Sequence, residues 1–304
     1  MKHILKTLVI LSIIAAIPLT AVAQEGGLRY SITVSKFENK AGWHGQWDIG
    51  SAWGTVMTDL LMQTGKFIVL GETDMRQEAL AEQDFAASGR TAGGNKAPAT
   101  GQMTPAQLLV KGAITHVQDD TAGGGGGVSF GGIRVGGKGA KSEINATIYI
   151  VDSTTGQVVA SESIVATSKE KGMSFGYTGH GLSTDAGGFK NDNVGKAVEA
   201  GCSMAVDFLL AELPNIQWTG SVVLNKDGKV YVNRGEREGV AVGQQFTVGD
   251  VEVIRDPDTG EILDEDMTIL ATLTVDTVKE KLSICSVSGG DAAAVEKGMT
   301  IHLP

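Results

Sequence analysis

The sequence predicts a mixed α/β domain (α+β, with a mixed sheet) that carries two glycine-rich hairpin inserts, followed by a small all-β barrel or sandwich domain. Three observations predict this fold: strand and helix patterns alternate up to residue 213, no helical period persists after residue 214, and glycine is concentrated in two segments. Glycine makes up 42 of the 304 residues, which is about twice its usual share. This length fits two domains.

The first 23 residues have the pattern of a secretory signal peptide. Lys2 and Lys6 precede an apolar run over Leu8–Leu19, and Ala21-Val22-Ala23 supplies the small residues of a cleavage site. We therefore expect the mature chain to begin at Gln24, to lack a lipoprotein cysteine, and to reach the periplasmic space bounded by the outer membrane. No later segment reaches the roughly 18 apolar residues of a membrane helix.

The first half of the α/β domain, which spans residues 24–214, reads as strand, helix, strand, helix. Alternation marks the strands, and a side-chain cap and a glycine bound the first helix. The expected elements are a strand over Arg29–Glu38, a helix from the N-cap Asp48 to Gly65, a strand over Lys66–Leu70, a helix from the N-cap Thr73 to about Phe85 and a loop over Ala87–Pro105.

The second half adds three strands and a long amphipathic helix over Asn193–Leu213. The strands cover residues 107–118, 143–151 and 157–168, and the turn Ser153–Gly156 joins the last two as an antiparallel pair. The glycine-rich inserts, residues 121–142 and 171–191, precede and follow this pair. We therefore expect both inserts to leave the strand pair at the end opposite the Ser153–Gly156 turn.

The last domain, residues 215–304, follows the boundary Pro214-Asn215. Asp227-Gly228 is a strong hairpin signal between strands over Ser221–Leu224 and Lys229–Asn233. Alternating patterns predict further strands over residues 245–255, 267–278 and 281–288. An acidic cluster begins at Asp256, and we interpret it as a solvated turn, because it lacks the glycine and glutamate spacing of a calcium loop.

Five segments of the α/β domain resemble the curli-assembly and holdfast-anchor secretion proteins, the CsgG/HfaB family. The resemblance covers about Leu28–Leu213, and its segments occur in the family's order. They are Phe37–Gly42, Trp47–Gly50, Leu60–Glu72, Glu82-Gln83 and Val151–Ala160. The resemblance implies a periplasmic domain that assembles into a homo-oligomeric ring, with two hairpins per subunit inserting together as an outer-membrane β-barrel.

The candidate membrane hairpins lie in the glycine-rich inserts. They alternate apolar residues with glycine or polar residues, but for fewer residues than the 9 to 11 of a lipid-spanning strand. We therefore weigh two interpretations, membrane hairpins built from glycine-diluted strands and flexible surface loops. The apolar residues concerned are Val128, Phe130, Ile133, Val135, Phe175 and Tyr177.

The resemblance also implies a pore constriction between the first strand and the first helix. The matching loop here contains Trp43, His44, Gln46 and Trp47, of which only the position of the loop is carried over from the family. Aromatic rings around a pore could grip a passing chain. The alternative is that Trp47 and Trp53 cover the start of the helix as a hydrophobic staple.

No residue pattern points to an enzyme, a metal site or a cofactor. The histidines His44, His116, His180 and His302 lack a metal-ligand spacing, and the run of glycines over Gly123–Gly127 lacks the lysine of a nucleotide loop. The net charge of −10 disfavours a nucleic-acid partner.

Two cysteines, Cys202 and Cys285, could form a disulfide in an oxidising compartment, but the patterns around them are more typical of small buried residues.

Two functions remain for the chain. The first is that of a ring-forming subunit of an outer-membrane secretion or assembly complex, whose partners are copies of itself and unfolded secreted or surface-fibre proteins. The second is that of a soluble periplasmic structural or binding protein without a pore. The missing lipoprotein cysteine and the low apolar content of the inserts favour the second.

Overall fold

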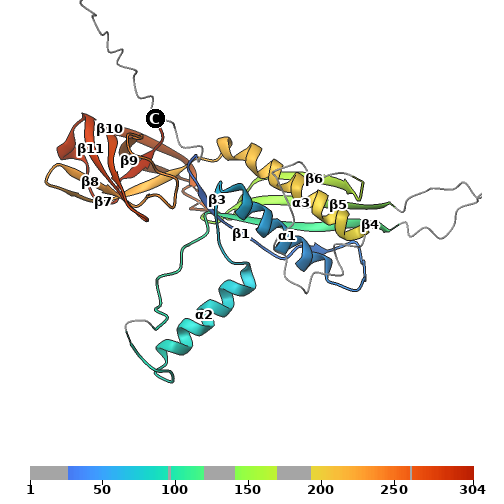
Figure 1. Cartoon of the computed structure of the whole chain (residues 1–304). Helices are drawn as coiled ribbons and strands as arrows, with labels where there is room; N and C mark the ends of the chain where they lie inside the picture. The colour runs from blue at the N-terminus through green and yellow to red at the C-terminus, as the bar shows by residue number, and fades with distance from the viewer. Residues whose placement is uncertain (1–26, 95–96, 120–140, 170–192, 261) are drawn as a thin grey trace, which may run out of the picture.

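The computed structural model describes residues 27–94, 97–119, 141–169, 193–260 and 262–304. It contains a mixed sheet covered by helices and a separate closed β-barrel, which lies at one end of the sheet (Figure 1). The expected signal peptide and nearly all of both glycine-rich inserts lie outside the described residues. The expectation of an α/β domain followed by a small β-barrel is confirmed.

The sheet of the first domain is mixed, as predicted. β1 is parallel to β3 and to β4, whereas β4, β5 and β6 form an antiparallel series. The sixth strand, β2, runs parallel to β4 beyond the end of β1. The order across the sheet is β3 (Phe67–Val69), β1 (Tyr30–Val34), β4 (Leu108–Asp119), β5 (Ser142–Asp152) and β6 (Val158–Thr167), with β2 (Glu38–Asn39) beside β4.

Two helices, α1 (Ile49–Thr64) and α3 (Asn193–Glu212), cover one face of this sheet (Figure 1). Both predicted ends of α1 are confirmed: the Asp48 side chain accepts a hydrogen bond from the Ser51 amide at 2.7 Å, and Gly65 adopts the left-handed conformation. The apolar stripes of the two helices pack on alternate residues of the central strands. Their buried partners on β5 are Ile144, Ala146, Ile148 and Ile150.

The predicted first strand, Arg29–Glu38, is divided into β1 and β2. Between Val34 and Glu38 the chain advances four residues while its partner β4 advances three. The extra residue allows Phe37 to turn inward, where its ring stacks on Trp53 at a centroid distance of 5.3 Å. The prediction of one continuous strand was therefore wrong, because burial of Phe37 interrupts the pairing.

The second helix, α2 (Thr73–Ala87), differs from the prediction at its start. Its N-cap residue is Glu72, not Thr73, and Glu72 makes no capping hydrogen bond with its side chain. The buried Glu72 carboxylate instead accepts a hydrogen bond from Thr55 of α1 at 3.3 Å. Burial, reinforced by the charge of Asp74, raises the pKa of Glu72. No residue of α2 is buried, and the helix projects from the domain (Figure 1).

The carboxy-terminal domain is a closed six-stranded barrel that follows a short 3₁₀ helix at Leu213–Asn215. Its last strand was not predicted, although this strand closes the barrel between β7 and β9. Another 3₁₀ turn, Ala292–Ala294, precedes that strand. The order around the barrel is β10 (Ile262–Val278), β11 (Ser283–Gly290), β8 (Lys229–Val232), β7 (Thr219–Lys226), β12 (Thr300–His302) and β9 (Gln245–Arg255).

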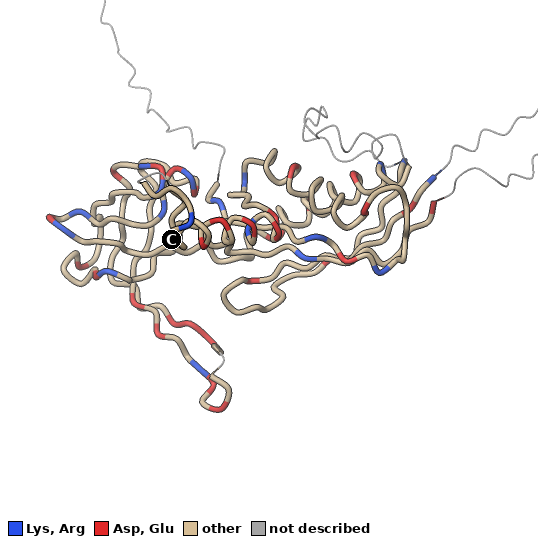
Figure 2. The backbone as a smooth tube through the Cα atoms, turned by 90° about the horizontal axis from the view of Figure 1, so that it is seen from below, with Lys and Arg blue, Asp and Glu red and all other residues tan. Residues whose placement is uncertain are grey.

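Two turns of the barrel domain agree with the sequence. Asp227 and Gly228 both have positive φ, as the tight turn between β7 and β8 requires. β9 and β10 extend beyond the barrel as a two-stranded ribbon rich in acidic residues (Figure 2). At its tip the Asp256 carboxylate accepts hydrogen bonds from the amides of Asp258 and Thr259, which confirms the predicted turn.

The two cysteines do not form a disulfide. Cys202 lies in α3, where its thiol donates to the carbonyl of Trp53 at 3.6 Å, and Cys285 lies in β11 of the barrel. Both are free and buried, and burial raises the pKa of each thiol. Each cysteine therefore serves as a small core residue of a different domain.

The contact between Phe37 and Gly112 gives a prediction about stability. A Cβ atom at Gly112 would lie 2.2 Å from the Phe37 ring, so Gly112→Ala should lower the free energy of unfolding by about 1 to 3 kcal/mol. Urea unfolding followed by tryptophan fluorescence measures this, because Trp53 stacks on the displaced ring. Gly93→Ala is the control, since its Cβ meets nothing within 4 Å, and equal stability of the two variants would contradict the packing.

Candidate functional site

The predicted constriction loop joins β2 to α1 and is held by its two tryptophans. The Trp43 and Trp47 rings meet at a centroid distance of 4.7 Å and an interplanar angle of 51°. Gly45 makes this possible, because a Cβ there would lie 1.9 Å from the Trp43 ring. Both rings are partly buried against the core, whereas the side chains of His44 and Gln46 are exposed.

Backbone and side-chain contacts fix this loop at both ends. At its start the amides of Lys40 and Ala41 both donate to the Ile114 carbonyl of β4 at 2.9 Å. At its end Asp48 accepts from the Lys36 ammonium at 3.0 Å. Partial burial opposes ionisation of Asp48, but the hydrogen bonds from Ser51 and Lys36 outweigh it and lower its pKa. These contacts hold both ends of the loop that carries the two tryptophans.

The roots of both glycine-rich inserts meet at one end of the sheet. Ser142, which begins β5, is fully buried, and its hydroxyl donates to the Asp119 carboxylate of β4 at 2.8 Å. Its amide donates to the Ser168 hydroxyl at 3.0 Å, and the Ser168 amide donates to the Ser142 carbonyl at 2.9 Å. These contacts, here called the root clamp, tie the end of β4, the start of β5 and the segment after β6 together.

The root clamp and the tryptophan loop lie at the same end of the first domain. β2 runs parallel to β4, so the loop after β2 leaves the sheet in the direction in which β4 runs toward Asp119. The amino end of α3 lies at this end too, and the barrel adjoins the opposite end (Figure 1). We call the first of these ends the insert end.

The apolar residues predicted for the membrane hairpins lie outside the described residues. They are Val128, Phe130, Ile133, Val135, Phe175 and Tyr177. The described residues Asp119, Ser142, Ser168 and Asn193 nevertheless show where the inserts begin and end. The sequence pattern indicated that the inserts share one end of the sheet, but nothing in it marked Ser142 as a buried anchor.

The described histidines are dispersed. His44 and His116 are exposed, and His302 of β12 lies in the barrel, where its Nδ1 is 2.8 Å from the Gln217 amide. Burial lowers the pKa of His302 against the opposing charge of Glu265. His180 lies outside the described residues. Within the described part of the chain, no group of three or more His, Cys, Asp or Glu side chains is placed to hold a metal ion.

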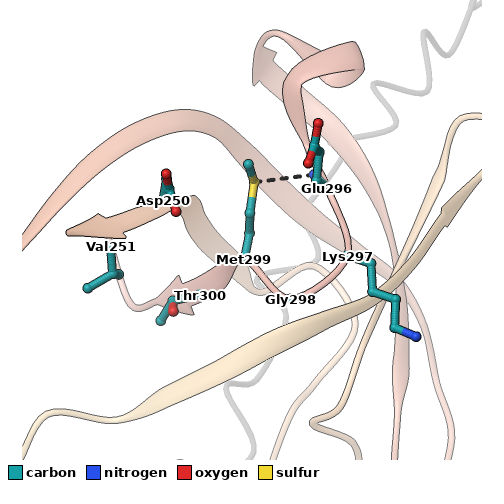
Figure 3. Close-up of a pocket in the computed structure, with 7 residues that line it drawn as sticks. All are labelled: Asp250, Val251, Glu296, Lys297, Gly298, Met299 and Thr300. Atoms are coloured by element: carbon teal, nitrogen blue, oxygen red, sulfur yellow. Dashed lines mark hydrogen bonds between the residues drawn. The ribbon is translucent and has the colours of Figure 1, made fainter. Parts of the chain in front are cut away.

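A shallow pocket of about 250 Å³ lies beside the barrel, between the start of the acidic ribbon and residues 296–300 (Figure 3). The Glu296 amide donates to the Met299 sulfur across it at 3.2 Å. Lys297 points away from the other labelled side chains. The pocket therefore gathers no set of catalytic groups.

None of the helices within the described ranges is long and apolar enough to cross a membrane.

Comparison with known protein families identifies the family of this chain. Residues 17–246 match the family described as curli production assembly/transport component CsgG. The chain belongs to the CsgG family. The match includes the whole α/β domain and ends inside β9, so most of the barrel lies beyond it. CsgG family membership makes this a secretion or assembly protein in general terms, and it agrees with the resemblance found in the sequence.

Solved structures resemble the chain only remotely. The hypothetical protein CT253 from Chlamydia trachomatis is 12% identical, with a TM-score of 0.34, and the alignment covers 59% of this chain and 95% of that one. The PelC dodecamer from Paraburkholderia phytofirmans is 11% identical, with a TM-score of 0.31 and coverages of 60% and 92%. Protein XCC0632 from Xanthomonas campestris is also 11% identical, with a TM-score of 0.32 and coverages of 62% and 85%. No curated protein sequence matches.

The root clamp gives a prediction for the insert end. Ser142→Ala removes the hydroxyl that bonds Asp119, so it should cost about 1 kcal/mol locally and speed hydrogen exchange at the start of β5 and the end of β6. Exchange measured by mass spectrometry checks this. The control is Ser163→Ala, because Ser163 is exposed on β6. Unchanged protection in Ser142→Ala would contradict the clamp.

Proposed function

We propose that this CsgG family member is a subunit of a homo-oligomeric ring that passes unfolded surface-fibre or adhesin proteins across the outer membrane. The root clamp carries this proposal, because it gathers the described ends of both inserts at the insert end. Hairpins that leave one end of each subunit can be placed side by side around a ring. Such hairpins could close together into one barrel, which leaves no open strand edge in the lipid.

Helix α2 supports the assembly into a ring. A helix of 15 residues is marginally stable in water when nothing packs on it, yet no residue of α2 is buried. Its large apolar side chains, Met75, Leu80 and Phe85, are 57%, 49% and 46% exposed. In the ring, a neighbouring subunit would cover part of this helix.

The tryptophan loop supplies the proposed constriction. Trp43 and Trp47 are partly buried and fixed, so they would line a narrow passage with little loss of side-chain entropy. The exposed His44 and Gln46 would add hydrogen-bonding groups beside the rings. An unfolded chain could thus be held weakly by apolar and polar contacts without any chemical step. The proposal therefore assigns no enzymatic activity to the subunit.

Membrane extraction tests the pore. In the full chain, replacing Val128, Phe130, Ile133 and Val135 by Ser removes the large apolar side chains of the first insert and leaves its length unchanged. We expect the wild type to stay in the membrane pellet after sodium carbonate extraction and this variant to be released. Ala92→Ser together with Ala99→Ser is the control, since both residues are exposed in the loop after α2. Release of the wild type would instead support a soluble periplasmic protein.

Oligomer size tests the role of α2 separately. The triple variant Met75→Gln, Leu80→Gln and Phe85→Gln keeps exposed positions exposed, so its fold should be retained while its assembly is weakened. Native mass spectrometry of detergent-extracted protein should show a closed ring for the wild type and smaller species for the variant. Leu263→Gln, on the exposed acidic ribbon, is the control. A monomeric wild type under every extraction condition would contradict the ring.

A further inference from the structure

A small cavity lies at the junction between the α/β domain and the barrel. Its volume is about 90 Å³, which is large enough for several waters or one small anion. Both domains line it. The polar lining consists of Ser31, Thr104 and Gln107 from the first domain and Arg234, Arg237 and Glu238 from the barrel domain.

One charged pair of this cavity is already satisfied. Glu238 is buried, and its carboxylate accepts from the Arg237 guanidinium at 2.6 Å and 2.8 Å and from the Gly235 amide at 2.8 Å. Arg237 also donates to the Thr104 hydroxyl at 3.2 Å. The Arg29 amide donates to the Glu238 carbonyl at 2.8 Å, which connects the domains a second time. This pair holds the junction together and has little capacity left for a ligand.

Arg234 is charged and partly buried, and its bonded partners are neutral. Its guanidinium lies over the Trp218 ring at 5.7 Å and donates to the carbonyls of Thr219 at 2.9 Å and Asn233 at 3.1 Å. Burial lowers the pKa of Arg234, against the opposing charge of Glu238. Among the ion pairs of the described residues, none involves Arg234. A partly buried cation without a bonded carboxylate loses part of its hydration, and this favours an anion beside it.

Gln107 faces the same cavity from the first domain. Its side-chain oxygen accepts from the Ser31 amide at 3.0 Å and from the Ser31 hydroxyl at 3.3 Å, which fixes the orientation of the amide. In the described part of the chain, no acceptor is bound to its side-chain nitrogen, so this group retains its two donors. The cavity thus has neutral donors on one wall and an arginine on the other.

We propose that this junction cavity binds a small oxyanion, either a carboxylate or inorganic phosphate, through the guanidinium of Arg234 and the side-chain amide of Gln107. A guanidinium matches the planar or tetrahedral arrangement of such oxygens with paired N–H donors. With two arginines and one glutamate, the cavity carries a net charge of +1 around the ligand. A bound anion would contact both domains and would therefore stabilise the angle between them.

Thermal unfolding and isothermal titration of the full mature chain test this site. Sodium phosphate, sodium acetate and sodium chloride are compared at equal ionic strength, so that general screening is the same. We expect a saturable rise of the unfolding midpoint with phosphate or acetate and none with chloride. A response to phosphate alone identifies phosphate, and a response to acetate alone identifies a carboxylate. No response beyond that of chloride would overturn the proposal.

Variants locate the binding to Arg234. Arg234→Gln should weaken binding about tenfold or more, whereas Arg255→Gln on the exposed ribbon should leave it unchanged. If Arg234→Gln does not fold, the wild type is modified with phenylglyoxal, with and without the anion, and mapped by mass spectrometry. Protection of Arg234 but not of Arg255 supports the site. If the anion changes the modification of Arg234 no more than that of Arg255, or if both variants bind the anion equally, the proposal is contradicted.

Discussion

The antiparallel pairing of β4 with β5 and of β5 with β6 is the constraint on which the rest of the structure depends. Its register places Asp119 opposite Ser142 and Glu143 opposite Thr167. Because side chains alternate between faces, a slip of one residue would turn the buried face of β5 toward solvent. The core under α1 and α3 therefore fixes the register, and the register fixes where both inserts leave the sheet.

This arrangement gives the first domain two distinct ends. The insert end carries the root clamp and the tryptophan loop, and the barrel adjoins the other end (Figure 1). There Arg237 and Glu238 contact the first domain. Helix α2 projects from the body and offers a surface that its own subunit leaves exposed. The roles we propose for membrane insertion, subunit contact and junction binding thus fall on separate parts of the molecule, and the proposed constriction shares the insert end.

Much of this fold could be predicted because its determinants are local. Asp48 and Gly65 bound α1 as expected, and Asp227-Gly228 forms the expected hairpin turn, since capping and turn geometry depend on a few adjacent residues. The break between β1 and β2 depends on Phe37 packing between Trp53 and Gly112, which are distant in sequence. Such contacts leave no periodic signal.

The position of the insert end could be predicted, whereas its contacts could not. The glycine-rich segments and the Trp43–Trp47 loop marked the insert end, because composition and spacing are visible in a sequence. The burial of Ser142 and the partial burial of Arg234 depend on strands and loops that meet only in the folded chain. The exposure of the apolar side chains of α2 likewise depends on the folded chain, because the capping and spacing signals that predict a helix do not show what packs on it.

The central claim is that subunits form a ring with the insert end in the membrane. Electron cryomicroscopy of the detergent-extracted wild-type protein tests this claim most directly, because one reconstruction shows both the ring and the orientation of its subunits. We expect a closed ring in which the root clamp of every subunit faces the detergent belt and the carboxy-terminal barrels lie on the opposite side. Trp43 and Trp47 should then surround the central axis. Separate monomers, or a ring whose carboxy-terminal barrels face the detergent, would contradict the account.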